Sequence, residues 1–248
     1  MRPDRFFAEL YRRNPLLALI GWLHVIALLA CAGAWLADDR LVLGSNAWVK
    51  PVKFMASTAV YLWTVAWLTR YVRRPRRAMK SVSVVIAAAT VIHNTCIVLQ
   101  AARGTPSHFN VATDFDAAVF HTMSAMALVN LLAVVAILFR FARPSTRLPA
   151  AYLWGIRAGI VLFLAGGAIG ILMLALDTHS VGAGDLRIPH GMALHALQVL
   201  PLAGWGLSRW GRLGGPGARL TLLAAAASGY AALVYALVSR ALVGGPLP

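Results

Sequence analysis

The chain is poor in charged residues and in cysteine. Only 12% of its 248 residues are charged, and it holds eight acidic residues and two cysteines. Soluble domains carry about a quarter charged residues, so this composition argues against ordinary soluble enzymes and disordered chains. Two cysteines are too few for a disulfide scaffold. Apolar residues make up 60% of the chain and the mean hydropathy is +0.72, which is typical of a membrane protein.

Seven long apolar segments follow one another along the chain. A membrane-spanning helix needs about 20 predominantly apolar residues, and each segment approaches or exceeds that length. Because every backbone polar group in lipid must be paired within the protein, these segments are expected to be helices. The sequence therefore predicts an all-α, polytopic seven-transmembrane-helix bundle, with spans at 15–37, 48–72, 81–100, 116–141, 150–176, 189–207 and 220–243. It shows no internal repeat.

Basic residues are distributed unevenly between the two sides of these spans. With the N-terminus in the cytoplasm, 17 of the 23 Lys and Arg residues and two of the eight acidic residues lie on the cytoplasmic side. The cytoplasmic face then carries the whole net charge of +15 and the outer face carries none. The positive-inside rule favours this orientation. An odd number of spans places the C-terminus outside the cytoplasm.

These observations predict a multi-pass protein of the cell (inner) membrane. Its expected parts are a basic cytoplasmic segment at 1–14, a single seven-helix membrane domain at 15–243 and a short C-terminal tail at 244–248. A net charge of +15 in a soluble protein would suggest nucleic acid as a partner. Here the topology accounts for the charge, and anionic lipid of the inner leaflet is the expected partner instead.

Three histidines lie at a similar depth in three different predicted spans. His93, His121 and His195 are each about 8–10 Å below the outer boundary, at a rise of 1.5 Å per residue. Neutral histidine enters a membrane without a charge penalty and is the commonest metal ligand. We therefore predict that these three ligate a metal or haem, with His190, His108 and His24 as secondary candidates. The alternative is that each histidine only bonds a neighbouring helix.

Other polar residues gather in the outer halves of the spans. Lys50 and Lys53 flank Pro51 at the start of the second span, where they either anchor the interface or bind a carboxylate, a phosphate or a haem propionate. We also expect Asp114 or Asp116 to lie close to Arg103, Lys50 or Lys53, because pairing lowers the desolvation cost. The residues predicted to bind an anion or another ligand are Lys53, Lys50, Arg103, Asp116, Gln198 and Asn94.

Several functional classes fit this pattern. The leading interpretation is a redox or electron-transfer centre near the extracytoplasmic face, holding haem b or a transition metal such as Cu, Zn or Fe, with a quinone or another small molecule as reaction partner. The alternatives are a transporter or binding protein for a small anionic or amphipathic ligand, a metal-dependent membrane hydrolase, and a scaffold without chemistry. The hydrolase class is weakened because no helix carries two histidines at i and i+4.

Overall fold

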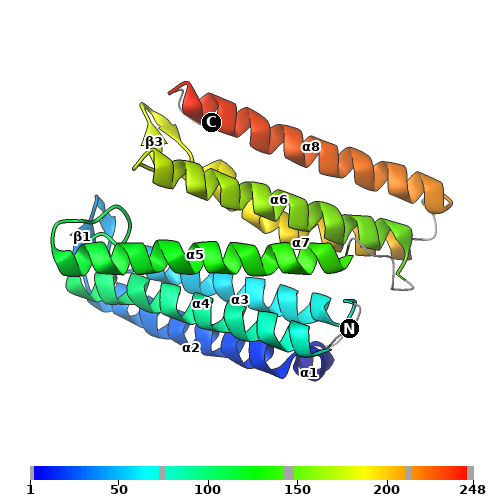
Figure 1. The fold of residues 1–248 in the computed structure, drawn as a ribbon, viewed down its shortest axis with the longest axis horizontal. Helices are drawn as coiled ribbons and strands as arrows, with labels where there is room; N and C mark the ends of the chain where they lie inside the picture. Colours follow the sequence, from blue (N-terminus) through cyan, green and yellow to red (C-terminus); the bar gives the residue numbers. More distant parts are fainter. Residues whose placement is uncertain (1–2, 73–75, 142–147, 211–213, 245–248) are drawn as a thin grey trace. The chain divides into compact units, whose positions relative to one another are not determined.

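A computed structural model describes residues 3–72, 76–141, 148–210 and 214–244. Within these ranges the chain is all-α, as predicted, apart from two short β-hairpins (Figure 1). In chain order the elements are α1 (Pro3–Arg13), α2 (Pro15–Ala37), β1 (Leu41–Val42), β2 (Ser45–Asn46), α3 (Val49–Thr69), α4 (Arg76–Arg103), α5 (Asp114–Phe141), α6 (Ala150–Ala175), β3 (Ser180–Val181), β4 (Gly184–Asp185), α7 (Arg187–Arg209) and α8 (Pro216–Leu242).

Five of these helices are long and apolar enough to cross a membrane, which indicates a multi-pass membrane protein. They are α2, α4 from Arg77 onward, α5, α6 and α8. The other two predicted spans coincide with α3 and α7. The start of α3 carries Lys50 and Lys53, and α7 includes two histidines and a glutamine. Both helices bury an apolar face inside the protein.

The chain forms two compact units, 1–136 and 137–248. The single membrane domain predicted over 15–243 stays a prediction. Unit 1 contains α1 to α4 and most of α5. The long helices of this unit run alongside one another in Figure 1. Gly21 of α2 admits the indole of Trp63 from α3, because a Cβ at Gly21 would lie 2.3 Å from the indole nitrogen.

Unit 2 contains α6, α7 and α8, and its most extensive contact joins α6 to α7. A Cβ at Gly155 would lie 2.5 Å from the carbonyl oxygen of Leu200, and a Cβ at Gly204 would lie 2.4 Å from that of Ala151. Gly166 also meets α7, at the side chain of Ala193. Small residues let two helix backbones approach closely in a membrane. Backbone contact therefore holds this pair together.

The same helix–hairpin–helix arrangement occurs once in each unit. In unit 1, α2 and α3 are joined by β1 and β2, and in unit 2, α6 and α7 are joined by β3 and β4. The side chain of Asn46 accepts a hydrogen bond from the backbone of Trp48 at 2.9 Å, and Asp185 accepts the corresponding bond from Arg187 at 2.9 Å. This structural repeat has no counterpart in the sequence, because the hairpins share backbone geometry but few side chains.

Candidate functional site

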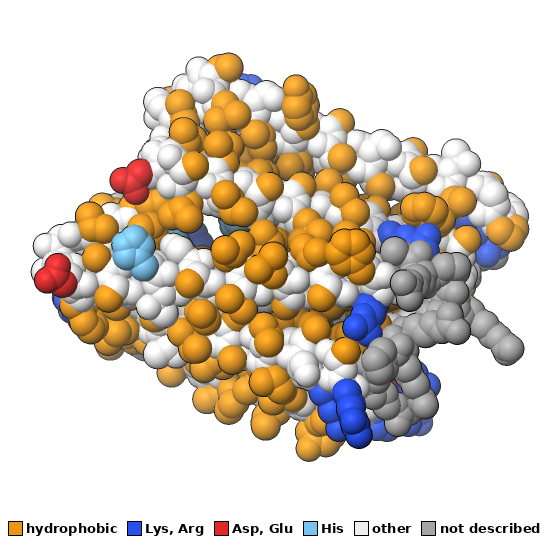
Figure 2. Space-filling model, viewed as in Figure 1, with side chains coloured by type: hydrophobic (Ala, Val, Ile, Leu, Met, Phe, Trp, Pro, Cys, Tyr) orange, Lys and Arg blue, Asp and Glu red, His pale blue; other side chains and the backbone are white. Residues whose placement is uncertain are grey.

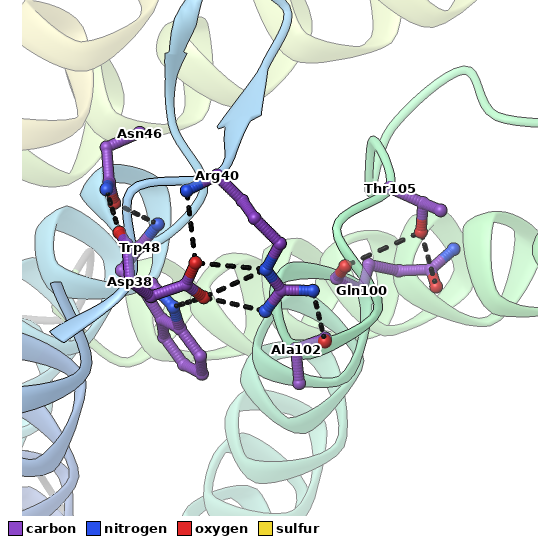
Figure 3. A network of polar contacts seen from close by, with 7 residues as sticks. All are labelled: Asp38, Arg40, Asn46, Trp48, Gln100, Ala102 and Thr105. Carbon is purple, nitrogen blue, oxygen red and sulfur yellow. Dashed lines mark hydrogen bonds and ion pairs between the residues drawn. The ribbon is translucent and has the colours of Figure 1, made fainter.

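The polar residues at one end of unit 1 form three groups of contacts. The first joins the β1–β2 hairpin to the end of α4 (Figure 3). Arg40 forms an ion pair with Asp38 at 2.6 Å and donates to the carbonyl of Ala102 at 3.1 Å. The indole of Trp48 also donates to Asp38, at 2.7 Å. Together these bonds fix the position at which α3 begins.

The carboxyl of Asp38 is held in its charged form by these partners. The hydrogen bonds from the Arg40 guanidinium, followed by that from the Trp48 indole, hold the pKa of Asp38 well below its usual range. The same contact raises the pKa of Arg40. The pair therefore stays ionised at neutral pH and adds no net charge to this end of the unit.

The second network joins the end of α4 to the start of α5. Asp116 accepts hydrogen bonds from Gln100 and Thr113, each at 2.8 Å, and pairs with Arg103. The expectation that Asp114 or Asp116 lies close to Arg103, Lys50 or Lys53 is confirmed for Asp116 and Arg103. Because Asp116 balances the charge of Arg103, this pair fastens α4 to α5. We therefore leave both residues out of the site proposed below, and their predicted role in binding a ligand stays untested.

A third group of side chains brings together α3, α4, α5 and the loop between α4 and α5. The ammonium of Lys50 lies 2.9 Å from Nδ1 of His108. The ring of His108 is centred 5.9 Å from that of His93 and 6.3 Å from that of Phe54. Phe120 of α5 approaches the same ring, with centroids 6.5 Å apart. We call Lys50, Phe54, His93, His108 and Phe120 the lysine–histidine cluster.

The bond between Lys50 and His108 defines the chemistry of this cluster. An ammonium only donates hydrogen bonds, so Nδ1 of His108 accepts and the ring is neutral, with its proton on Nε2. Lys50 also lies 5.9 Å from the centre of the Phe54 ring, within range of a cation–π contact. The cluster thus combines one positive charge, two imidazoles and two phenyl rings.

Further polar contacts continue from the cluster toward the middle of unit 1. Nδ1 of His93 lies 3.4 Å from the side-chain oxygen of Asn94, whose amide donates to Thr58 at 2.9 Å. Deeper along α3, Tyr61 donates to Asn130 of α5 at 2.9 Å. Asn94, predicted to bind a ligand, therefore links α3 to α4 and contacts a cluster histidine.

The structure brings together only some of the predicted site residues. His93 and the secondary candidate His108 approach each other, whereas His121 and Lys53 are exposed on α5 and α3. Within the described ranges, no group of three or more His, Cys, Asp or Glu residues is arranged to hold a metal ion. Whether His195 approaches His93 and His121 stays a prediction, because His195 belongs to unit 2.

The remaining candidates lie in local environments of their own. His24 is buried in α2 and its Nδ1 lies 2.8 Å from the carbonyl of Ile20, one turn earlier, which supports a packing role. In unit 2, His190 bonds the carbonyl of Gly166 at 2.8 Å, so it links α7 to α6. His195 is exposed on α7, and Gln198 is partly buried one turn further on.

Sequence reasoning missed the aromatic members of the cluster. Phe54 follows Lys50 by four residues and so shares its helix face, a spacing that could have indicated the pair. Phe120 directly precedes His121, which was a predicted ligand. The side chain of His121 is exposed, so it points to solvent or lipid and not to the cluster. No protein-family model, curated protein or solved structure matches the chain, so the site has to be interpreted from its own geometry.

Proposed function

We propose that the chain is a seven-span membrane protein that binds a small ligand with an anionic head and an apolar body at the lysine–histidine cluster. In this proposal α3 and α7 also cross the bilayer, the N-terminus is cytoplasmic, and the cluster lies near the extracytoplasmic face. The seven long helices and the uneven charge distribution support this topology. A reporter fused to the C-terminus should be active outside the cytoplasm, and cytoplasmic activity would contradict the orientation.

The observation that carries the proposal is the ammonium of Lys50, placed 2.9 Å from a histidine and next to an aromatic ring. A lysine ammonium carries a positive charge and three N–H donors. A carboxylate or a similar anion is the chemistry that matches this charge.

The surroundings of Lys50 indicate the rest of the ligand. Phe54, Phe120 and Phe109 present aromatic rings around His108, with centroid distances of 6.3, 6.5 and 6.4 Å. Ligand sites commonly combine apolar and aromatic walls with a few polar groups that fix orientation. We therefore infer an amphipathic ligand, such as a short-chain carboxylate, which the protein binds or carries across the membrane.

The matched lysines of α3 provide the test. Octanoate serves as the probe, and its effect on the thermal unfolding of the purified full chain is measured for the wild type, Lys50→Met and Lys53→Met. Octanoate should stabilise the wild type and Lys53→Met, because Lys53 is exposed, but not Lys50→Met. Equal stabilisation of the two variants would contradict the proposed site, and so would the absence of any effect on the wild type.

A metal or haem centre is the second candidate, favoured by the approach of His93 and His108 to 5.9 Å between ring centres. The ammonium of Lys50 beside His108 opposes a bound cation, which is why we rank this candidate second. An absorption spectrum of the purified protein, oxidised and then reduced, together with elemental analysis, tests it directly. A Soret band or stoichiometric Cu, Zn or Fe that is lost in His93→Ala would favour this centre over the carboxylate site.

A further inference from the structure

The opposite end of unit 1 is strongly basic. Six described basic side chains lie there with one described acidic side chain, Glu9; the basic residues are Arg5, Arg12, Arg13, Arg70, Arg77 and Lys80. Figure 2 shows Lys and Arg side chains gathered where α1 lies in Figure 1. The networks at the other end of the unit, by contrast, pair Asp38 with Arg40 and Asp116 with Arg103.

Helix α1 is fixed against this end by its aromatic face. The ring of Phe6 stacks on that of Trp67 at 5.3 Å, and Phe7 contacts Trp22 at 4.8 Å and Trp63 at 5.2 Å. Leu10, which follows them in α1, is almost completely buried. Because the apolar face of α1 packs on the protein, its exposed face is the one that carries Arg5, Tyr11 and Arg12.

Three arginines share the carboxyl of Glu9. Arg12, Arg13 and Arg70 all pair with it, and the Arg13 hydrogen bond is the main reason that the pKa of Glu9 lies below its usual range. Arg13 is held in place, since its guanidinium lies 3.6 Å from the centre of the Trp67 ring and donates to the Trp67 carbonyl at 2.8 Å. The side chains of Arg12 and Arg70 remain 70% and 56% exposed. One carboxylate and three guanidiniums leave an excess of two positive charges.

This group lies next to the start of α2, the first helix that is long and apolar enough to cross a membrane. Asn14 alone separates α1 from α2, and it caps α2 by accepting a hydrogen bond from Leu17 at 3.1 Å. Its amide also donates to Ser83 of α4 at 2.8 Å, so α4 is at the same end. Tryptophan is enriched at the level of lipid headgroups, and Trp22 is 42% exposed here.

We propose that Arg12 and Arg70, held on either side of Glu9, bind the phosphate of an anionic phospholipid in the surrounding leaflet. A guanidinium has five N–H donors in a planar fork, so each arginine has donors for a phosphate besides those directed to Glu9. The adjacent α2 presents an exposed apolar surface that suits the acyl chains, including Leu19, Leu23 and Ile26. A lipid fits better than a soluble partner because α2, which carries this apolar surface, begins one residue after α1 ends.

The experiment uses the full chain in nanodiscs with equal amounts of phosphatidylglycerol and phosphatidylcholine. After extraction, the lipids retained by the protein are measured by mass spectrometry for the wild type and for Arg12→Gln/Arg70→Gln. The wild type should retain phosphatidylglycerol selectively, and the double variant should lose selectivity at least about fivefold, since one basic residue near an anionic surface contributes about that factor. Lys53→Gln/Arg240→Gln removes two exposed charges elsewhere and should retain the selectivity of the wild type.

Two further arms make the outcome decisive. Arg12→Lys/Arg70→Lys keeps the charge and should keep most of the selectivity, because an ammonium also donates hydrogen bonds to a phosphate; a loss equal to that of the Gln variant would show that positive charge at these positions does not retain the lipid and would overturn the proposal. Excess inorganic phosphate should not displace the retained lipid, and displacement would identify a site for free anions instead. Full selectivity in Arg12→Gln/Arg70→Gln would also overturn it. None of these outcomes depends on the lysine–histidine cluster.

Discussion

The two units share a helix–hairpin–helix arrangement but hold their helices together by different means. In unit 2, α6 and α7 meet through glycine backbones at Gly155, Gly159 and Gly204. In unit 1, α3 is bonded to its neighbours by side chains, from Thr58 to Asn94 and from Tyr61 to Asn130. Backbone contact leaves no room for a ligand between α6 and α7, whereas the polar contacts of α3 continue to His93 of the lysine–histidine cluster. The proposed ligand site thus lies in the unit whose helices meet through side chains.

The largest effect is expected at the glycine contact of unit 2. Gly155→Ala places a methyl group 2.5 Å from the Leu200 carbonyl oxygen, so α6 and α7 must separate. Overpacking of this kind costs about 1–3 kcal/mol, which unfolding in a denaturing detergent would measure. Gly206→Ala on α7 is the control, because nothing lies within 4 Å of the added group. Equal stability of the two variants would show that backbone contact does not hold unit 2 together.

A smaller effect, dependent on pH, is expected at the hairpin of unit 1. The pKa of Asp38 lies below its usual range because of Arg40 and Trp48. The contribution of the Asp38–Arg40 pair to stability is therefore complete above the ordinary aspartate pKa of about 4 and is lost as the pH falls toward the lowered value. Asp38→Asn should reduce stability at neutral pH and flatten this acid dependence, as measured by thermal unfolding across pH.

The Asp185–Arg187 ion pair of unit 2 serves as the comparison for this pH experiment. Arg187 likewise lowers the pKa of Asp185. Asp185 lies in the hairpin that precedes α7, just as Asn46 lies in the hairpin that precedes α3. Asp185→Asn should therefore leave the acid dependence that arises from Asp38 in place. Identical pH profiles for the wild type and Asp38→Asn would show that the pair contributes nothing measurable to the hairpin.

The smallest effect is expected at the polar contacts inside unit 1. Thr58→Val keeps the shape of the side chain but removes the acceptor of the 2.9 Å bond from Asn94. Interhelical bonds of this kind average about 0.6 kcal/mol in membrane proteins. The control is Thr90→Val, since the Thr90 hydroxyl bonds the Ile86 carbonyl of its own helix. A loss in Thr58→Val no greater than in the control would remove this distinction between the units.

Much of the fold was predictable because its signals are local. The span predicted at 15–37 matches α2 at both ends, where Asn14 caps the helix and Pro15 suits its first position. The span predicted at 81–100 is the central part of α4. The helix continues beyond this span through charged residues, to Arg76 at one end and to Arg103 at the other. Hydropathy marks where a helix becomes apolar, whereas charged turns extend it beyond that point.

The site was only partly predictable because its members meet through tertiary structure. The Arg103–Asp116 pair was expected, since a short loop joins two helix ends that carry opposite charges. The approach of His108 to His93 was not, because the path of the loop between α4 and α5 decides it. Similar depth in the membrane suggested His121 as a partner of His93, but depth does not determine the helix face, and His121 is exposed.

The central claim is that Lys50 makes the outer end of unit 1 a site for an anionic, amphipathic ligand. The most direct test compares the affinities of octanoate and 1-octanol, which differ mainly in charge, by calorimetric titration of the wild type, Lys50→Met and Lys53→Met. A charge-assisted hydrogen bond is worth about 1.5–3 kcal/mol. The wild type and Lys53→Met should therefore bind octanoate at least about tenfold more tightly than octanol, and Lys50→Met should bind the two alike. The same preference for octanoate in Lys50→Met, or none in the wild type, would contradict the account.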